Sequence, residues 1–463
     1  MSQESNIEML KSIPSVDKIL NWTEIKELEN KIEHIYLTEI IRNKTDEFRA
    51  KLLSGDKFDI DHLKQMILDE IKYLTEPYFR YAVNGLGIVL HTGLGRAPFA
   101  KGIADILRDA SDAYSRLQID DEGKRDDRYK KISKLLQILT GCEAGIIVNN
   151  NAGATLLILS AIAKGKEVIV SRGQLIEIGG SFRIPDIMAQ SGAIMREVGT
   201  TNRSHLKDYE QAINENTGAI IRVHQSNYRM SGFTKEVSLE ELVTLGKKYN
   251  IPVIDDLGSG ALIDLSKYGL PKEPMVQESI KTSADIVCFS GDKLIGGPQC
   301  GIIIGKKTHI EKIKKHPLTR ALRCDKLTNV VLEATLQMFL HKEEDLIKEH
   351  GVMSLLLKPL KEIKTQANDV ARKLKKEYSS ILEIEVKPAK SEIGGGSLST
   401  EELPTYVIAI NPKKLSAQEL AKFLRQYKTP IFGRVAEDSL LLDFRTILKG
   451  EEKIIIEAFK NIL

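Results

Sequence analysis

The chain has 463 residues, too many for one small domain, so two or three domains are expected. Hydrophobic residues make up 42% and charged residues 28%, which gives enough apolar material for a sizeable core, and the net charge of +3 by itself says nothing about nucleic acid. No apolar run reaches the roughly 18 residues of a transmembrane helix, and no signal peptide is recognisable, so we expect a cytoplasmic protein.

Residues 1–78 are expected to form a small helical domain. Two apolar series recur near the helical period. They are Ile25, Leu28, Ile32 and Ile35, and then Leu63, Met66, Ile67, Ile71 and Leu74. Thr23 and Asp59 are suitable N-caps for the two helices. Residues 45–58 between them are largely polar and contain Gly55, which favours a connecting segment.

Residues 79–335 show short apolar runs, rich in Val and Ile, that alternate with helical stretches. The runs are Ala144–Val148, Glu167–Val170, Ala193–Glu197, Gly218–Val223, Val253–Ile254, Ile286–Phe289 and Gly301–Ile304. This alternation is typical of an α/β domain with a mostly parallel sheet buried on both faces.

Residues 336–463 are expected to form a smaller α+β domain. A helical region from 327 to 378 leads into it, and Gly394, Gly395 and Gly396 interrupt the chain. The remaining expected elements are strands at Tyr406–Ile410 and Leu440–Phe444 and a helix from Glu451.

The clearest chemical motif is the loop around Lys293, which reads Phe289-Ser290-Gly291-Asp292-Lys293 and ends in a glycine-rich turn. A partly desolvated lysine on a tight loop after a buried strand has a lowered pKa and becomes a Schiff-base nucleophile. Ser290 offers a hydroxyl to a phosphate, whereas Asp292 takes part in proton transfer or caps the loop. We therefore predict that Lys293 carries pyridoxal 5'-phosphate (PLP).

Two further segments fit that cofactor. Asp256 ends a strand 37 residues before Lys293, at the edge where open α/β sheets bind ligands, and a PLP enzyme needs a carboxylate on the ring nitrogen. A metal pair with Asp255 or a helix N-cap is the alternative. Asn150, Asn151 and Ala152 lie between a strand and a helix, where backbone N–H groups bind anions.

His224 and Arg96 are weaker candidates. His224 follows a strand and either contacts the cofactor ring, acts in proton transfer or is structural. Arg96 follows a glycine-rich run, which indicates either an anion clamp for the substrate or simply a glycine-rich entry to the domain.

Residues 306–326 form a basic stretch that either attracts anions or is a solvated helix face. It contains Lys306, Lys307, Lys312, Lys314, Lys315, Arg320, Arg323 and Lys326 against Glu311 and Asp325. Arg320 and Arg323 would share one face of a helix.

The four cysteines, Cys142, Cys288, Cys300 and Cys324, have no CxxC spacing and no accompanying His cluster. We expect free, mostly buried thiols and no metal site.

The whole chain resembles the bacterial selenocysteine synthases, the L-seryl-tRNA(Sec) selenium transferases. The matching stretches are Ile13–Asp17, Leu90–Pro98, Val148–Ala152, Ser171–Pro185, Glu197–Arg203, Asp256–Gly260, the Lys293 loop, His316–Arg323, Gly394–Leu398 and Leu442–Thr446. One departure is that Asp126 and Asp127 stand between Arg125 and Arg128, where the family has small residues, so the role of these two arginines stays open.

The resemblance implies a fold-type-I PLP enzyme that converts seryl-tRNA(Sec) and selenophosphate into selenocysteinyl-tRNA(Sec), by β-elimination to aminoacrylyl-tRNA and addition of selenium. It implies a tRNA-binding N-terminal domain, a homodecamer built as a ring of dimers, and no membrane or DNA partner. Arg96, Arg320 and Arg323 resemble positions that hold selenophosphate. The alternatives are a PLP lyase or aminotransferase for a small amino acid and an inactive RNA-binding protein.

Overall fold

A computed structural model describes residues 10–28, 31–56, 58–179, 182–397 and 401–462. Gly180, Ser181 and Leu398, which belong to the motifs above, lie outside the described residues. The contacts divide the chain into two compact units, Met1–Tyr81 and Ala82–Leu463. In the described part of the chain, no helix combines the length and the apolar character needed to cross a membrane.

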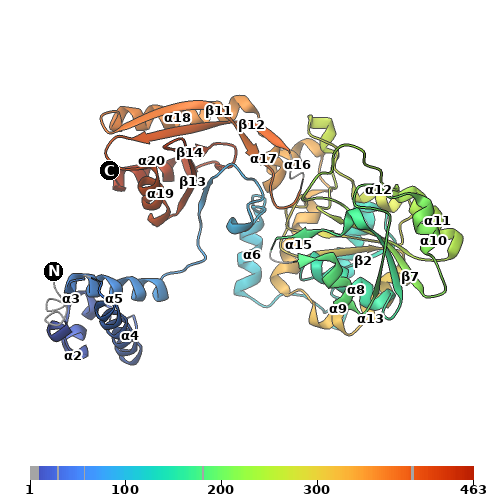
Figure 1. Ribbon diagram of the computed structural model, residues 1–463, viewed down its shortest axis with the longest axis horizontal. Helices are drawn as coiled ribbons and strands as arrows, with labels where there is room; N and C mark the ends of the chain where they lie inside the picture. Colours follow the sequence, from blue (N-terminus) through green and yellow to red (C-terminus); the bar gives the residue numbers. More distant parts are fainter. Residues whose placement is uncertain (1–9, 29–30, 57, 180–181, 398–400, 463) are drawn as a thin grey trace. The chain divides into compact units, whose positions relative to one another are not determined.

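The first unit is helical. Its helices are α2 (Val16–Leu20), α3 (Thr23–Lys26), α4 (His34–Leu53) and α5 (Ile60–Thr75), drawn in blue in Figure 1. Asp59 caps α5 as predicted, because its side chain accepts a hydrogen bond from the backbone N–H of His62 at 2.9 Å.

Two expectations for this unit were wrong. Trp22, not Thr23, is the N-cap of α3. Residues 45–53 belong to α4 rather than to a connecting segment. The reason is that Phe48 and Leu52 are buried on the face that Leu37 and Ile41 begin, so the polar residues between them cover the opposite face of one continuous helix.

The second unit contains a seven-stranded sheet in the order β2-β10-β9-β8-β7-β3-β6. Its strands are β2 (Ala144–Val148), β3 (Glu167–Ser171), β6 (Ile194–Val198), β7 (Thr217–Val223), β8 (Val253–Gly258), β9 (Ile286–Ser290) and β10 (Gly301–Gly305). All seven apolar runs are therefore confirmed as strands. β10 is antiparallel to both neighbours and the other pairs are parallel, so the mostly parallel sheet is also confirmed.

Helices pack on the strands of this sheet. α7 (Lys130–Thr140), α8 (Asn151–Ile162) and α13 (Lys307–Lys315) contact β2 or β10, whereas α11 (Leu239–Tyr249) contacts β7 and β8. Every residue of β2, β9 and β10 is buried. This burial on both faces explains why their sequences read as continuous apolar runs.

A five-stranded sheet, ordered β1-β13-β14-β12-β11, forms the C-terminal part of the same unit. Its strands are β1 (Val83–Gly85), β11 (Leu382–Glu392), β12 (Glu402–Pro412), β13 (Ile431–Ala436) and β14 (Ser439–Asp443). α18 (Leu360–Tyr378), α19 (Ala417–Gln426) and α20 (Glu451–Ile462) complete it. β1 pairs with β13, so residues 83–85 join the C-terminal sheet although the sequence groups them with the large domain.

The remaining helices and strands lie between these elements along the chain. They are η1 (Thr92–Leu94), α6 (Ile103–Asp112), η2 (Arg172–Gln174), β4 (Glu177–Ile178), β5 (Phe182–Arg183), α9 (Ile184–Ser191), α10 (Leu206–Ala212), η3 (Leu265–Tyr268), α12 (Val276–Lys281), α14 (Leu318–Ala321), α15 (Lys326–Met338), α16 (Glu343–Glu349) and α17 (Gly351–Leu356).

Candidate active site

A cavity of about 230 Å³ lies where β7, β8 and β9 end and α8 begins. Its lining contains Arg96, Asn150, Asn151, Ala152, Ile176, Gly179, Ile184, Val223, His224, Ser226, Asp256, Gly258, Ser290, Asp292, Lys293 and Gln299. The structure thus brings together every residue predicted to be catalytic or to bind the cofactor, and Arg96 with them. The described lining does not include Arg320 or Arg323.

Lys293 lies in the loop that joins the antiparallel strands β9 and β10. The loop is tight: the backbone N–H of Gly291 donates to the carbonyl of Cys300 at 2.8 Å, and a Cβ on Gly291 would lie 2.4 Å from the sulfur of Cys300. Lys293 is only 4% exposed. Burial lowers the pKa of its amine, and the nearby Arg96 guanidinium lowers it further, as expected for a nucleophilic lysine.

Asp256 is held by the first turn of α8. Its Oδ1 accepts a hydrogen bond from the Asn151 amide and its Oδ2 one from the Thr155 hydroxyl, both at 2.9 Å. Burial raises the pKa of this carboxyl, and the hydrogen bonds from Asn151 and Thr155 oppose that rise. Sequence analysis did not assign a role to Thr155. The spacing in the sequence could have indicated Thr155, because it follows Asn151 by four residues and therefore lies on the same face of the helix.

Asp255 points to the other face of the sheet, as alternation along β8 requires. Its Oδ2 accepts a hydrogen bond from the Ser279 hydroxyl at 2.6 Å, and its Oδ1 lies 3.3 Å from Nε of Arg222. The two aspartates therefore belong to separate environments, and the choice of Asp256 agrees with the geometry.

The N-terminus of α8 forms one wall of the cavity. Asn150 is its N-cap, and the side-chain oxygen of Asn150 accepts a hydrogen bond from the backbone N–H of Gly153 at 2.7 Å. The side chain of Asn151 turns to Asp256, although its own oxygen is buried without a partner among the described residues. Backbone N–H groups of this turn are thus the groups that suit an anion.

Arg96 reaches the Lys293 loop from a distant part of the sequence. Its guanidinium lies 2.7 Å from Oδ2 of Asp292. Arg96 has a φ of 63°, which is uncommon for a residue other than glycine and costs conformational energy. Arg96 forms its ion pair with Asp292 from this left-handed backbone conformation.

Arg320 and Arg323 lie outside the cavity lining, and both are exposed. The shared helical face expected for them is wrong, because α14 ends at Ala321. The chain leaves the helix there so that Asp325 can cap α15, with its side chain accepting from the backbone N–H of Thr328. Arg323 instead lies near Arg128, whose pKa is lowered by burial and by the positive charge of Arg323.

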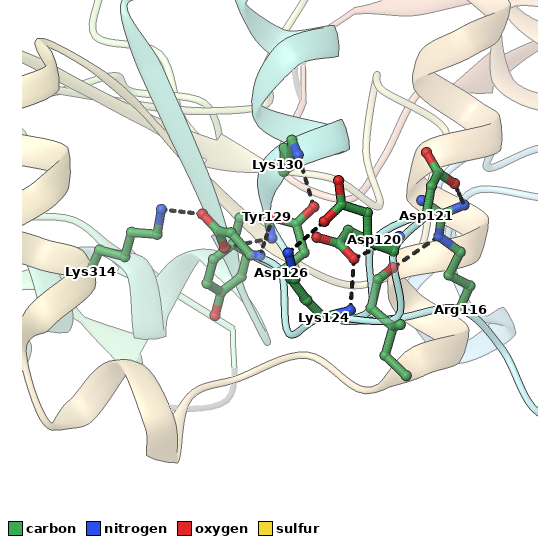
Figure 2. A network of polar contacts seen from close by, with 11 residues as sticks. Arg116, Asp120, Asp121, Lys124, Asp126, Tyr129, Lys130 and Lys314 are labelled. Carbon is green, nitrogen blue, oxygen red and sulfur yellow. Dashed lines mark hydrogen bonds and ion pairs between the residues drawn. The ribbon is translucent and has the colours of Figure 1, made fainter.

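Residues 120–128, here called the acidic loop, form a network of surface ion pairs with one another and with basic side chains nearby (Figure 2). The pairs are Arg116–Asp121, Lys124–Glu122, Lys130–Asp126 and Lys314–Asp127. Lys314 belongs to the basic stretch, and Lys306 of that stretch pairs with Asp285 at 2.6 Å. Part of the basic stretch is therefore neutralised within the chain. Three of the loop aspartates, Asp121, Asp126 and Asp127, likewise have cationic partners within the chain.

Three further residues near Lys293 were not singled out from the sequence. Ser226 and Gln299 line the cavity. Gly396, with a φ of 69°, comes from the C-terminal part, and a Cβ there would lie 3.6 Å from Nζ of Lys293. The triple glycine was noted as a break between elements, but only the fold reveals that it approaches the lysine. All four cysteines are free and buried, as expected.

Comparison with known proteins places this geometry in a family. The family model described as L-seryl-tRNA selenium transferase matches residues 82–448. A protein named L-seryl-tRNA(Sec) selenium transferase from Alkaliphilus oremlandii is 46% identical over 97% of this chain and 98% of its own length. One of the same name from Carboxydothermus hydrogenoformans is 47% identical over 96% of each chain.

A solved structure of D-glucosaminate-6-phosphate ammonia-lyase is similar in fold, with a TM-score of 0.55 and 20% identity, covering 83% of this chain and 96% of that chain. The family model covers well over half of the chain, and the relatives match it almost end to end. The chain therefore belongs to the L-seryl-tRNA selenium transferase family.

Proposed function

We propose that this chain converts L-seryl-tRNA(Sec) to L-selenocysteinyl-tRNA(Sec), with PLP as cofactor and selenophosphate as selenium donor. The observation that carries the proposal is the buried Lys293 amine in a cavity shared with Asp256 and the N-terminus of α8. Family membership supplies the substrate, because relatives that match nearly the whole chain bear the name of this activity.

The cavity residues fit PLP. The buried carboxyl of Asp256 suits the ring nitrogen, and the first turn of α8 with Ser290 suits the phosphate. The unpartnered oxygen of Asn151 is a further polar atom in the same wall. When bound, PLP supplies an electron sink for the charge left by removal of the α-proton.

The roles of the residues follow from their positions. The amine of Lys293, whose pKa is lowered by burial, would hold PLP covalently, and the same amine is placed to accept the α-proton of the seryl group. Asp256 would hold the ring nitrogen in its protonated form, and His224 lies in the wall of the same cavity. Asp292, paired with Arg96, is placed to take part in proton transfer next to Lys293.

Selenophosphate would be bound by Arg96, with Arg320 and Arg323 supplying positive charge at the approach to the site. Guanidinium groups suit this anion because they form paired charge-assisted hydrogen bonds. Arg320 and Arg323 are both exposed, so their guanidinium groups are accessible to an anion.

Residues 1–78 would hold the tRNA, and the enzyme would act in the cytoplasm as a homodecamer. Support for the tRNA role comes from the separation of Met1–Tyr81 as a compact unit of its own. Deleting residues 1–78 is expected to weaken tRNA binding more than PLP binding. Unchanged affinity of the truncated protein for seryl-tRNA(Sec) would give the unit another role.

The deciding experiment is incubation of the purified protein with PLP, seryl-tRNA(Sec) and selenophosphate, followed by mass spectrometry of the amino acid released from the tRNA. We expect selenocysteine. Free serine serves as the matched control, because a small-molecule lyase or aminotransferase on this fold would consume it. Turnover of free serine with no selenocysteine on the tRNA would contradict the proposal.

A further inference from the structure

Glu273 is a buried carboxylate next to the candidate site that the roles above do not use. It lies between η3 and α12 and is 4% exposed. Its Oε1 accepts a hydrogen bond from the hydroxyl of Ser259, which is itself fully buried. The same oxygen lies 3.5 Å from Nε2 of His224, within ion-pair distance although long for a hydrogen bond.

A buried carboxylate is costly unless hydrogen bonds and an opposite charge compensate it. The Ser259 hydroxyl is neutral, and His224 is the one basic side chain within ion-pair distance of Glu273 among the described residues. A structural role, in which Ser259 alone anchors the segment that carries Glu273, leaves the approach of Glu273 to His224 unexplained.

The contacts around the cavity lead to the same partner. Arg96 pairs with Asp292, and the Lys293 amine lies in the field of Asp292, Asp256 and Glu273. Of these three carboxylates, Glu273 is the one that lies within ion-pair distance of His224.

His224 is also fixed at its backbone. Its N–H donates to the carbonyl of Asp256 at 2.8 Å, at the end of β7. An imidazole anchored by its backbone on one side and by a carboxylate at Nε2 on the other has one preferred orientation. In that orientation Nδ1 is the ring nitrogen that Glu273 does not engage.

We propose that Glu273 is a positioning residue of this site: its carboxylate, oriented by Ser259, faces Nε2 of His224 and keeps the imidazole ring in place at the cavity wall. The inference rests on the proposed function, because it takes the cavity lined by His224 as the PLP site. Glu273 acts through His224 and does not itself line the cavity.

The test uses the full-length protein with PLP bound and compares Glu273→Gln with the wild type. The readouts are the pH dependence of the absorbance of the lysine-bound cofactor and the dissociation constant for PLP. We expect Glu273→Gln to shift the pH profile and to weaken PLP binding about tenfold, the loss of one charge-assisted contact. Glu278→Gln is the matched control, because Glu278 on α12 pairs with Lys272 and does not contact His224. It should leave both readouts unchanged.

A double-mutant cycle shows whether Glu273 acts through His224. In a His224→Ala background, Glu273→Gln should have no further effect on the dissociation constant for PLP. The pH profile does not serve in this cycle, because Glu273 also acts directly on the Lys293 amine. Additive effects, or a Glu273→Gln protein with wild-type absorbance and affinity, would overturn the proposal.

A second variant guards against misfolding of Glu273→Gln. Ser259→Ala keeps the carboxylate but removes the hydroxyl that orients it, and it should change both readouts in the same direction by a smaller factor. Wild-type readouts in Ser259→Ala would count against the proposal. Absence of a lysine-bound chromophore in the wild type, or its persistence in Lys293→Ala, would instead contradict the PLP site itself.

Discussion

The cavity around Lys293 and the acidic loop are both rich in charge, but they handle it in opposite ways. In the cavity, Lys293 and Asp256 are 4% and 5% exposed. Burial lowers the pKa of the Lys293 amine and raises the pKa of the Asp256 carboxyl, so it favours the neutral form of both groups. In the acidic loop, the side chains of Asp121 and Lys124 are 89% and 73% exposed and pair with close neighbours in sequence.

The contrast teaches where chemistry is to be sought. Water screens the loop pairs, so they contribute little to stability, and the pairing of Asp126 with Lys130 favours the charged form of both groups. Desolvation in the cavity instead lowers the pKa of the Lys293 amine, which favours its nucleophilic form. The number of charged residues in a segment is therefore a poor guide to function. A buried ionisable group with a shifted pKa is a better guide.

The largest effect is expected in the cavity. Lys293→Ala should abolish the absorbance of the lysine-bound cofactor and all turnover, because no other side chain would replace the buried amine. Circular dichroism should show an intact fold. A variant that keeps a lysine-linked chromophore would move the cofactor to another lysine.

Arg320→Ala and Arg323→Ala should each slow selenium transfer about ten- to a hundredfold, since a charge-assisted hydrogen bond contributes roughly 1.5–3 kcal/mol. Loss of the seryl hydroxyl should change less, because selenophosphate reacts after that step. The two arginines also suit a tRNA backbone. In that case the variants would lose tRNA affinity with a reduced salt slope, while their selenophosphate dependence would stay normal.

Arg96→Ala should change the pH dependence of cofactor uptake. The Arg96 guanidinium lowers the pKa of the Lys293 amine and pairs with Asp292, so its removal takes away one cation and frees an anion. Both changes favour the charged amine and raise its pKa toward the ordinary 10.5. Because uptake of PLP needs the neutral amine, the rate should rise with pH and its midpoint should move upward. A midpoint that is unchanged or lower would contradict the electrostatic account.

The smallest effect is expected in the acidic loop. Lys130 holds the pKa of the Asp126 carboxyl below its usual range. Their pairing therefore stabilises the folded protein at a pH above the ordinary pKa of the carboxyl, and this stabilisation is lost as the pH falls through the lowered pKa. Lys130 is exposed and Asp126 is half-buried at the surface, and Asp126→Asn should leave PLP binding and turnover unchanged at neutral pH. A large loss of activity would mean that the loop belongs to an active site.

Much of this arrangement could be predicted from the sequence. The seven apolar runs became the strands of the large sheet because both faces are buried and the signal is local to each run. The Lys293 loop and Asp256 were found because each directly follows such a strand.

What could not be predicted depends on distant contacts. The extent of α4 was missed because its buried face is widely spaced among polar residues. β1 pairs with β13, which lies hundreds of residues later in the chain. Gly396 approaches Lys293 across about a hundred residues of sequence. The partnership of His224 with Glu273 is of the same kind, because no local pattern links a strand end to a loop beyond the next strand.

The most direct test of the central claim is chemical location of the cofactor lysine. Reduction of the purified protein with borohydride fixes PLP to the amine that carries it, and peptide mass spectrometry then identifies the residue. We predict labelling of Lys293 in the peptide that contains Asp292. Labelling of any other lysine, with Lys293 unmodified, would contradict the assignment of this cavity as the active site.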